Sequence, residues 1–225
     1  IILGADIGTT LTVQLIAFQI QKLAPLIIAI GFFTRFAAKK KKIKSLGLAI
    51  LGFGFIFLSL QMMIEAMRPV QSYPWVLDLL GSLGDRPVLT ILIAALLTAL
   101  FSSSAATLGI AMAMGGQGLI TLKTALPIIL GANVGTSATA WVASIGAPVE
   151  AKRVAMAHVL FKALGVLLLY PFLIPFEFWI DGTSALLPRQ IANAHAFFNI
   201  GLAAVFLPLS NLFAKGITRL IPVPP

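Results

Sequence analysis

The sequence predicts an all-α membrane protein: a multi-pass helical bundle with inverted repeats, broken helices and a re-entrant hairpin. Of its 225 residues, 59% are apolar and only 10% are charged, and the mean hydropathy is +1.02. Soluble domains carry about 25% charged residues, so the composition argues against a soluble enzyme or a nucleic-acid-binding protein. The absence of cysteine from the sequence excludes disulfides, thiolate catalysis and thiolate metal sites.

Apolar stretches define the expected spans, because a helix needs about 20 such residues to cross a bilayer. Some stretches are short, some are interrupted by Ser, Gly or Pro, and some are clean. The short ones are 1–18 and 23–36, the interrupted ones are 88–101, 105–114 and 125–145, and the clean ones are 45–64, 154–176 and 191–213.

The distribution of charge predicts the orientation of these spans. Six basic residues lie between Arg35 and Lys44 without an acidic one, which is typical of a cytoplasmic loop. The basic residues at 152–153 and 215–219 are assigned to the same side, and the acidic loops 68–86 and 177–190 to the other. An odd number of crossings must then lie between 86 and 150. Three thin crossings and a re-entrant hairpin followed by one crossing both satisfy this condition. The hairpin is preferred, because the serine triplet at 102–104 is more typical of a hairpin tip than of a water-exposed loop.

An internal repeat divides the chain. GADIGTTLT at 4–12 matches GANVGTSAT at 131–139 with five identities. Matched, interrupted hydrophobic segments in two halves indicate a secondary transporter with its site near the membrane midplane. The first half is assigned to 1–86, with a connecting span and an outer loop. The second half, 87–225, is assigned a hairpin at 87–120, a broken helix at 121–147 and two closing spans at 151–214. A serine-rich hairpin tip is expected upstream of Ile1.

The repeated glycines predict breaks within the two matched helices. Such breaks expose carbonyl and hydroxyl oxygens suited to Na⁺, and N–H groups suited to an anion. Thr9 or Thr10 would cap one restarting helix, and Thr136 or Ser137 the other. The alternative interpretation is that the glycines allow helices to pack closely.

Other polar residues in apolar segments allow more than one role. Asp6 is a lone carboxylate that could bind a cation or a proton, or lie at an interface. The triplet 102–104 supplies hydroxyls and amides for an anion-sized nest, with no lysine or arginine in the segments concerned. His158 and His195 favour structural hydrogen bonds over a metal site, and Asn193 and Asn199 favour bonds between helices. No P-loop, nucleotide fingerprint or Ser-His-Asp arrangement occurs in the sequence, so no enzymatic activity is expected.

These motifs together resemble the type II sodium/phosphate cotransporters, specifically their bacterial branch. The resemblance rests on GADIGTTLT, GANVGTSATAW, LTALFSSSAATLGIA and the paired AxAHxxF segments around His158 and His195. It implies two hairpin tips that meet to bind phosphate and Na⁺. The glutamine that precedes the serines in that family is absent, and Asp6 stands where the family usually has asparagine. The resemblance also implies a bacterial inner-membrane location and a PhoU-like cytoplasmic domain or partner.

The resulting expectation is Na⁺-coupled symport of inorganic phosphate by alternating access, with Na⁺ as the coupling ion. An oxyanion channel and a non-transporting phosphate sensor or scaffold are the alternatives. The residues expected to serve fall into three groups. Phosphate is assigned to Ser102, Ser103, Ser104 and Thr107; Na⁺ to Asp6, Thr9, Thr10, Asn133, Thr136 and Ser137; and the backbone geometry to Gly4, Gly8, Gly131 and Gly135.

Overall fold

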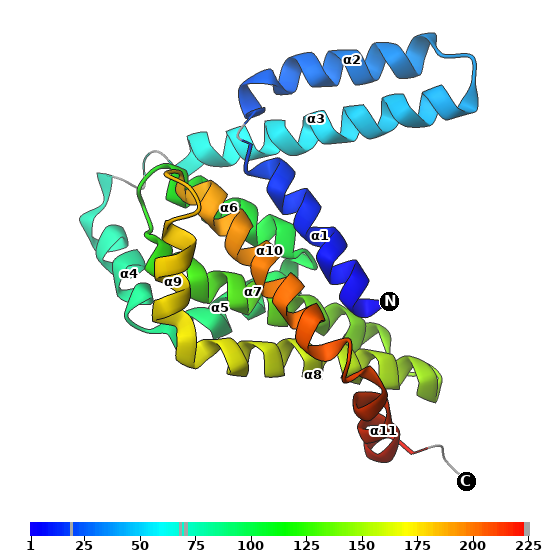
Figure 1. Cartoon of the computed structure of the whole chain (residues 1–225). Helices are drawn as coiled ribbons and strands as arrows, with labels where there is room; N and C mark the ends of the chain where they lie inside the picture. Colours follow the sequence, from blue (N-terminus) through cyan, green and yellow to red (C-terminus); the bar gives the residue numbers. More distant parts are fainter. Residues whose placement is uncertain (19, 68, 70–71, 223–225) are drawn as a thin grey trace.

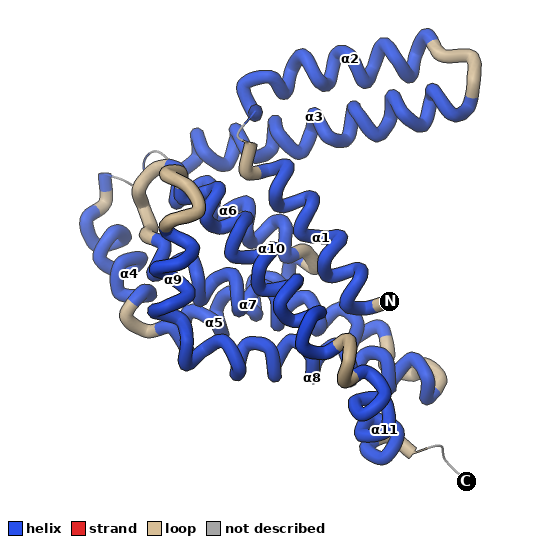
Figure 2. Tube along the Cα trace, viewed as in Figure 1, coloured by secondary structure: helices blue, strands red, loops and turns tan. Residues whose placement is uncertain are grey.

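The computed structural model describes residues 1–18, 20–67, 69 and 72–222, and within these ranges it contains helices and no strand (Figures 1 and 2). The elements follow one another as α1 (Ile2–Ile16), a 3₁₀ turn (Ile20–Leu23), α2 (Ala24–Ala37), α3 (Lys41–Met67), α4 (Pro74–Gly84), α5 (Pro87–Phe101), α6 (Ser104–Gly116), α7 (Leu122–Ala143), α8 (Val149–Leu169), a second 3₁₀ turn (Tyr170–Phe172), α9 (Leu173–Asp181), α10 (Leu187–Phe206) and α11 (Ser210–Leu220).

The helices include several that are long and apolar enough to cross a bilayer, which confirms a multi-pass α-helical membrane protein. Four such spans lie in the described residues: Ile20–Ala37, Lys41–Ala66, Leu122–Ala143 and Val149–Asp181. Two bent pairs, α4 with α5 at 106° and α10 with α11 at 82°, raise the number to six if each is one span.

One predicted span is wrong in its second half. The stretch 191–213 was expected to be one clean crossing, but α10 ends at Phe206 and the chain turns sharply into α11. Pro208 lies in this turn. Proline lacks the backbone N–H that the helix ladder requires, so the turn has a local cause.

Helix α7 lies at the centre of the bundle and packs against α5, α6 and α8, while α10 packs beside α1 (Figure 1). The largest cluster of buried side chains joins α1, α6, α7 and α10, with Leu108 and Ile129 almost fully buried within it. A second cluster joins α8 to α10 through Phe161, Phe198 and Phe206.

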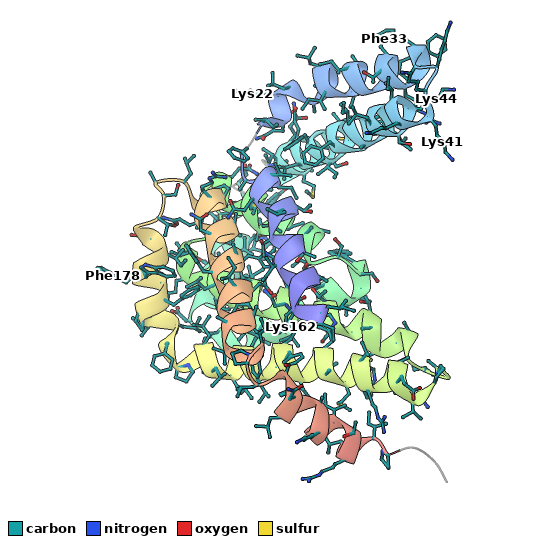
Figure 3. All side chains as sticks on the ribbon, turned by 45° about the vertical axis from the view of Figure 1, so that its right-hand side comes forward. Lys22, Phe33, Lys41, Lys44, Lys162 and Phe178 are labelled. Atoms are coloured by element: carbon teal, nitrogen blue, oxygen red, sulfur yellow. The ribbon has the colours of Figure 1, made fainter. Side chains whose placement is uncertain are left out.

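The helices α2 and α3 form a hairpin that projects from the rest of the bundle (Figure 1). Lys41 and Lys44 lie at its tip (Figure 3). At the other end of the molecule, the side-chain Nε of Arg153 donates a hydrogen bond of 3.0 Å to the carbonyl of Ile221. The basic groups at 152–153 and 215–219, which the charge pattern assigned to one side, therefore lie together. The third group, at the tip of the α2–α3 hairpin, lies away from both.

The segment 85–123 leaves the bundle end and returns to it. Lys123 at the start of α7 forms an ion pair of 2.6 Å with Asp85, which lies two residues before the start of α5. At the same end, Gln117 Nε2 donates to the carbonyl of Ile64 at 3.1 Å. Between these points the serine turn joins α5 to α6, and α7 follows. The assignment of this part of the chain as a re-entrant hairpin followed by one crossing stays a prediction.

The predicted helix breaks at the repeated glycines are wrong. Both α1 and α7 continue without interruption through GADIGTTLT and GANVGTSAT. A Cβ at Gly131 would overlap the Ile91 carbonyl of α5, and a Cβ at Gly135 would overlap the Ala95 carbonyl. The glycine spacing therefore serves close packing of α7 against α5, because small residues let two backbones approach.

The equivalent glycines of α1 have no such neighbour. Nothing in the described residues lies within 4 Å of a Cβ built at Gly4 or Gly8. The two copies of the repeat thus share a helical conformation but differ in what packs against their glycines.

Candidate functional site

The serine triplet forms the turn between α5 and α6. Ser102 ends α5 in the left-handed conformation, with φ 53° and ψ 28°. Ser103 is the N-cap of α6, and its Oγ accepts a hydrogen bond of 3.2 Å from the N–H of Ala106. The first turn of a helix leaves backbone N–H groups without intrahelical partners. Those of Ser104 and Ala105 follow the cap directly, which is the arrangement that favours an anion.

A buried hydrogen bond holds the hairpin together below this turn. Thr98 of α5 donates to the hydroxyl of Thr107 of α6 at 2.8 Å. Thr98 is fully buried and Thr107 is 4% exposed. Thr107 therefore links the two helices beneath the tip, whereas Ser102 and Ser103 are the more accessible hydroxyls of the triplet.

The tip borders a cavity of about 670 Å³. Ser103, Ala105 and Ala106 line one wall, Thr12 of the first repeat copy lines another, and residues of α3, including Ser59, complete it. Most of the wall is apolar, with hydroxyls at a few points, as is common for small-ligand sites. The structure thus brings the serine turn and the first repeat copy to one cavity.

A second polar feature lies inside the bundle, around the side chain of Lys162 on α8 (Figure 3). Its Nζ lies 3.0 Å from Asp6 Oδ2 of α1. It also donates to Asn133 Oδ1 of α7 at 3.0 Å and to Asn199 Oδ1 of α10 at 2.7 Å. Lys162 is 1% exposed and Asp6 is 5% exposed. Four helices therefore converge on one buried ammonium group, and we call these residues the Lys162 cluster: Asp6, Asn133, Lys162 and Asn199.

The cluster satisfies the demands of a buried charge. An isolated ammonium in an apolar interior is costly unless it is paired and hydrogen-bonded. Here one carboxylate supplies the opposite charge and two amide oxygens accept the other hydrogen bonds. The amides are themselves oriented, because Asn133 Nδ2 donates to the carbonyl of Ile129 and Asn199 Nδ2 to that of His195.

The two histidines lie beside the cluster. His158 Nε2 is 3.5 Å from Asp6 Oδ1, and His195 is 1% exposed one helical turn before Asn199. Among the described residues, no group of three His, Cys, Asp or Glu side chains could hold a metal ion. The predicted bonds between helices are confirmed for Asn199, and also for Asn193, whose Oδ1 accepts from Gln14 Nε2 at 3.0 Å.

The residues assigned to Na⁺ do not form a ready-made cage. The oxygens of Asp6 and Asn133 face the Lys162 ammonium instead. The four hydroxyls do not cap restarting helices either, because in an unbroken helix such a hydroxyl bonds a carbonyl three or four residues earlier. These bonds run from Thr9 to Asp6 O, Thr10 to Ile7 O, Thr136 to Ala132 O and Ser137 to Val134 O.

Lys162 is the residue that the sequence analysis missed. It lies in the middle of the stretch 154–176, which was treated as a clean span. A lysine within a predicted span is itself a signal of function. Its partners, however, come from three other helices, and no local pattern connects them.

Comparison with known proteins bears on what this arrangement serves. A family model described as Na⁺/Pi-cotransporter matches residues 1–65 and 73–212. The chain belongs to this family. No solved structure matches it significantly.

Relatives in the family carry different names. The chain is 34% identical to the uncharacterized protein YqeW of Bacillus subtilis, covering 98% of this chain and 72% of that protein. It is 30% identical to the "Putative inorganic phosphate export protein YjbB" of Salmonella typhimurium, covering 98% of this chain but 41% of that protein. Over 97 residues it is 38% identical to the human sodium-dependent phosphate transport protein 2B, covering 40% of this chain and 14% of that protein.

Proposed function

We propose that the chain carries inorganic phosphate across a bacterial inner membrane, coupled to Na⁺, by alternating access. The observation that carries this proposal is the serine turn at the start of α6, open to a cavity that the first repeat copy also lines. Membership of the Na⁺/Pi-cotransporter family and the names of two relatives, for phosphate export and for sodium-dependent phosphate transport, support it.

Phosphate would bind at the turn through backbone N–H groups and hydroxyls. The N–H groups of Ser104 and Ala105 point out of the first turn of α6, where the helix dipole favours negative charge. Ser102 and Ser103 add hydroxyl donors. All of these donors are neutral, so the anion would be held without a fixed counter-charge at the turn itself, which suits a substrate that must later be released.

Na⁺ would accompany phosphate in the same cavity. A hard cation prefers oxygen ligands, and hydroxyls of Thr12, Ser59 and Ser103 line the wall. The cation would also offset part of the phosphate charge. We therefore expect phosphate and Na⁺ to enter together, while the oxygens of the Lys162 cluster stay with the ammonium.

Flux in proteoliposomes tests the proposal. We expect uptake of ³²P-phosphate to saturate and to depend on a Na⁺ gradient, compared with choline at equal ionic strength. Both gradient directions should be measured, because one relative is named for export. Ser103→Ala should reduce the flux at least tenfold, whereas Ser82→Ala, which removes a hydroxyl of α4 that bonds the carbonyl of Leu79 in its own helix, should not.

The results also separate the alternatives. Flux that does not saturate and ignores Na⁺ would indicate an oxyanion channel. Phosphate binding without flux would indicate a sensor or scaffold. Equal flux in wild type and Ser103→Ala would remove the serine turn from the proposed site. A PhoU-like cytoplasmic partner remains a prediction, to be tested by co-purification from a bacterial membrane.

A further inference from the structure

The Lys162 cluster has the composition of a cation site. One carboxylate oxygen and two amide oxygens converge on a single point from α1, α7 and α10. Carboxylate and carbonyl oxygens are also the ligands that hard metal cations prefer. The positive charge at this point is the ammonium of Lys162, which reaches it from α8.

Stability alone is a weak explanation for such a pair. Replacing a buried ion pair by well-packed apolar residues is often neutral or even stabilising. The chain offers a contrast in Lys123 and Asp85, whose ion pair of 2.6 Å has side chains that are 57% and 71% exposed. That pair is exposed to solvent, whereas the Lys162 pair is buried and two neutral amide oxygens also contact its ammonium.

The position of the cluster connects it to the proposed transport site. Asn133 lies between Gly131 and Gly135, the two glycines that pack α7 against α5 of the serine hairpin. Asp6 lies on α1, as does Thr12, which lines the cavity at the serine turn. The charge on Lys162 is thus held in part by α1, which lines the proposed substrate site, and by α7, which packs against α5 of the serine hairpin.

We propose that the Lys162 ammonium is a resident cation, which permanently occupies a cation position formed by Asp6, Asn133 and Asn199. It takes the place that a free Na⁺ would otherwise fill. This inference rests on the proposed function and deepens it. The ammonium already neutralises the Asp6 carboxylate, so no Na⁺ binds at the cluster. Each phosphate is therefore accompanied by one Na⁺ fewer than if the cluster were a Na⁺ site.

Removing the ammonium tests the proposal without measuring transport. In Lys162→Ala, the Asp6 carboxylate and the two amides surround a vacated space. We expect this variant to bind Na⁺ or methylammonium there. Purified in detergent, it should gain about 3–6 °C in Tm when the cation reaches ten times its dissociation constant, relative to choline at equal ionic strength. The proposed transport site takes Na⁺ together with phosphate, so the measurement is made without phosphate, and there wild type and Lys123→Ala should show no comparable gain.

A double variant identifies the charge responsible. Adding Asp6→Asn to Lys162→Ala removes both charges and keeps the same vacated space, so this double variant should not respond to Na⁺. If Lys162→Ala yields folded protein only when Na⁺ or methylammonium is present during purification, that dependence supports the proposal equally. The absence of any cation effect on both yield and Tm would overturn it. So would the same Na⁺ response in the double variant.

The resident-cation proposal and the transport proposal can fail separately. If phosphate flux is absent but Lys162→Ala acquires Na⁺ binding, the resident cation stands and the transport proposal fails. If flux is Na⁺-coupled but Lys162→Ala does not respond to cations, the transport proposal stands and the resident-cation proposal fails. Where both hold, the Na⁺ dependence of flux in a folded Lys162→Ala should become steeper, with the Hill coefficient rising by about one.

Discussion

Alanine at Gly135 tests how the serine hairpin is held in place. A Cβ there would overlap the carbonyl of Ala95 and would lie 2.7 Å from the Cβ of Thr98. Carbon atoms pack best at about 3.5–4.0 Å, so α5 would have to move by about 1 Å at this point. Thr98 also donates the 2.8 Å hydrogen bond to Thr107, and the same displacement would strain it.

The expected magnitude follows from two opposing effects. Overpacking of this kind costs about 1–3 kcal/mol, while replacing a helical glycine by alanine gains about 0.5–1 kcal/mol. The difference between these two effects centres on about 1 kcal/mol, so we expect Gly135→Ala to lower the free energy of unfolding by about that amount and to reduce phosphate flux by moving the turn.

A matched control is available on α10. Gly201 is exposed and helical, and nothing described lies within 4 Å of a Cβ built there. Gly201→Ala should therefore be neutral or stabilising by up to about 1 kcal/mol. Unfolding in detergent, followed by circular dichroism, compares the two variants. If Gly135→Ala were as stable as Gly201→Ala, the close packing of α7 against α5 would not be what fixes the hairpin.

Three further predictions follow from single contacts. Ser102→Gly should raise the free energy of unfolding by about 1 kcal/mol, because the left-handed conformation is unfavourable for serine; a lower Tm would contradict this. Asp6→Asn should lower it by about 3–5 kcal/mol by leaving the Lys162 ammonium without its counter-charge; Tm and yield measure the loss, and no change would show that the ion pair is unimportant. Lys123→Ala should leave Tm unchanged, since its pair with Asp85 is solvated; a clear decrease would assign that pair a structural role.

The sequence predicted the fold class and the serine turn well, for physical reasons. Long apolar segments and clustered charges follow directly from the bilayer, and 88–101 and 105–114 correspond closely to α5 and α6. The serines between them favour a turn and a helix cap, because their side chains bond nearby backbone groups. Ser103 is accordingly the cap of α6.

The repeated glycines were found from the sequence but assigned the wrong role. A glycine pair four residues apart weakens a helix and also opens a groove for a neighbouring helix. Which effect prevails depends on whether a partner lies against it. For Gly131 and Gly135 that partner is α5, more than thirty residues earlier in the chain. Similarly, the convergence of Asp6 and Asn199 on Lys162 depends on tertiary packing, which no local pattern contains.

The contact between α5 and α7 has a consequence for how the serine turn can move. Where Gly131 and Gly135 meet α5, their neighbours are backbone atoms of Ile91 and Ala95 and the Cβ atoms of Ala94 and Thr98, none of which can move by a change of rotamer. The two helices therefore have almost no room to shift against each other at this contact. The turn would then shift only as part of a rigid unit with α7, so any change in which side of the membrane it faces must come from sliding at other, softer helix boundaries.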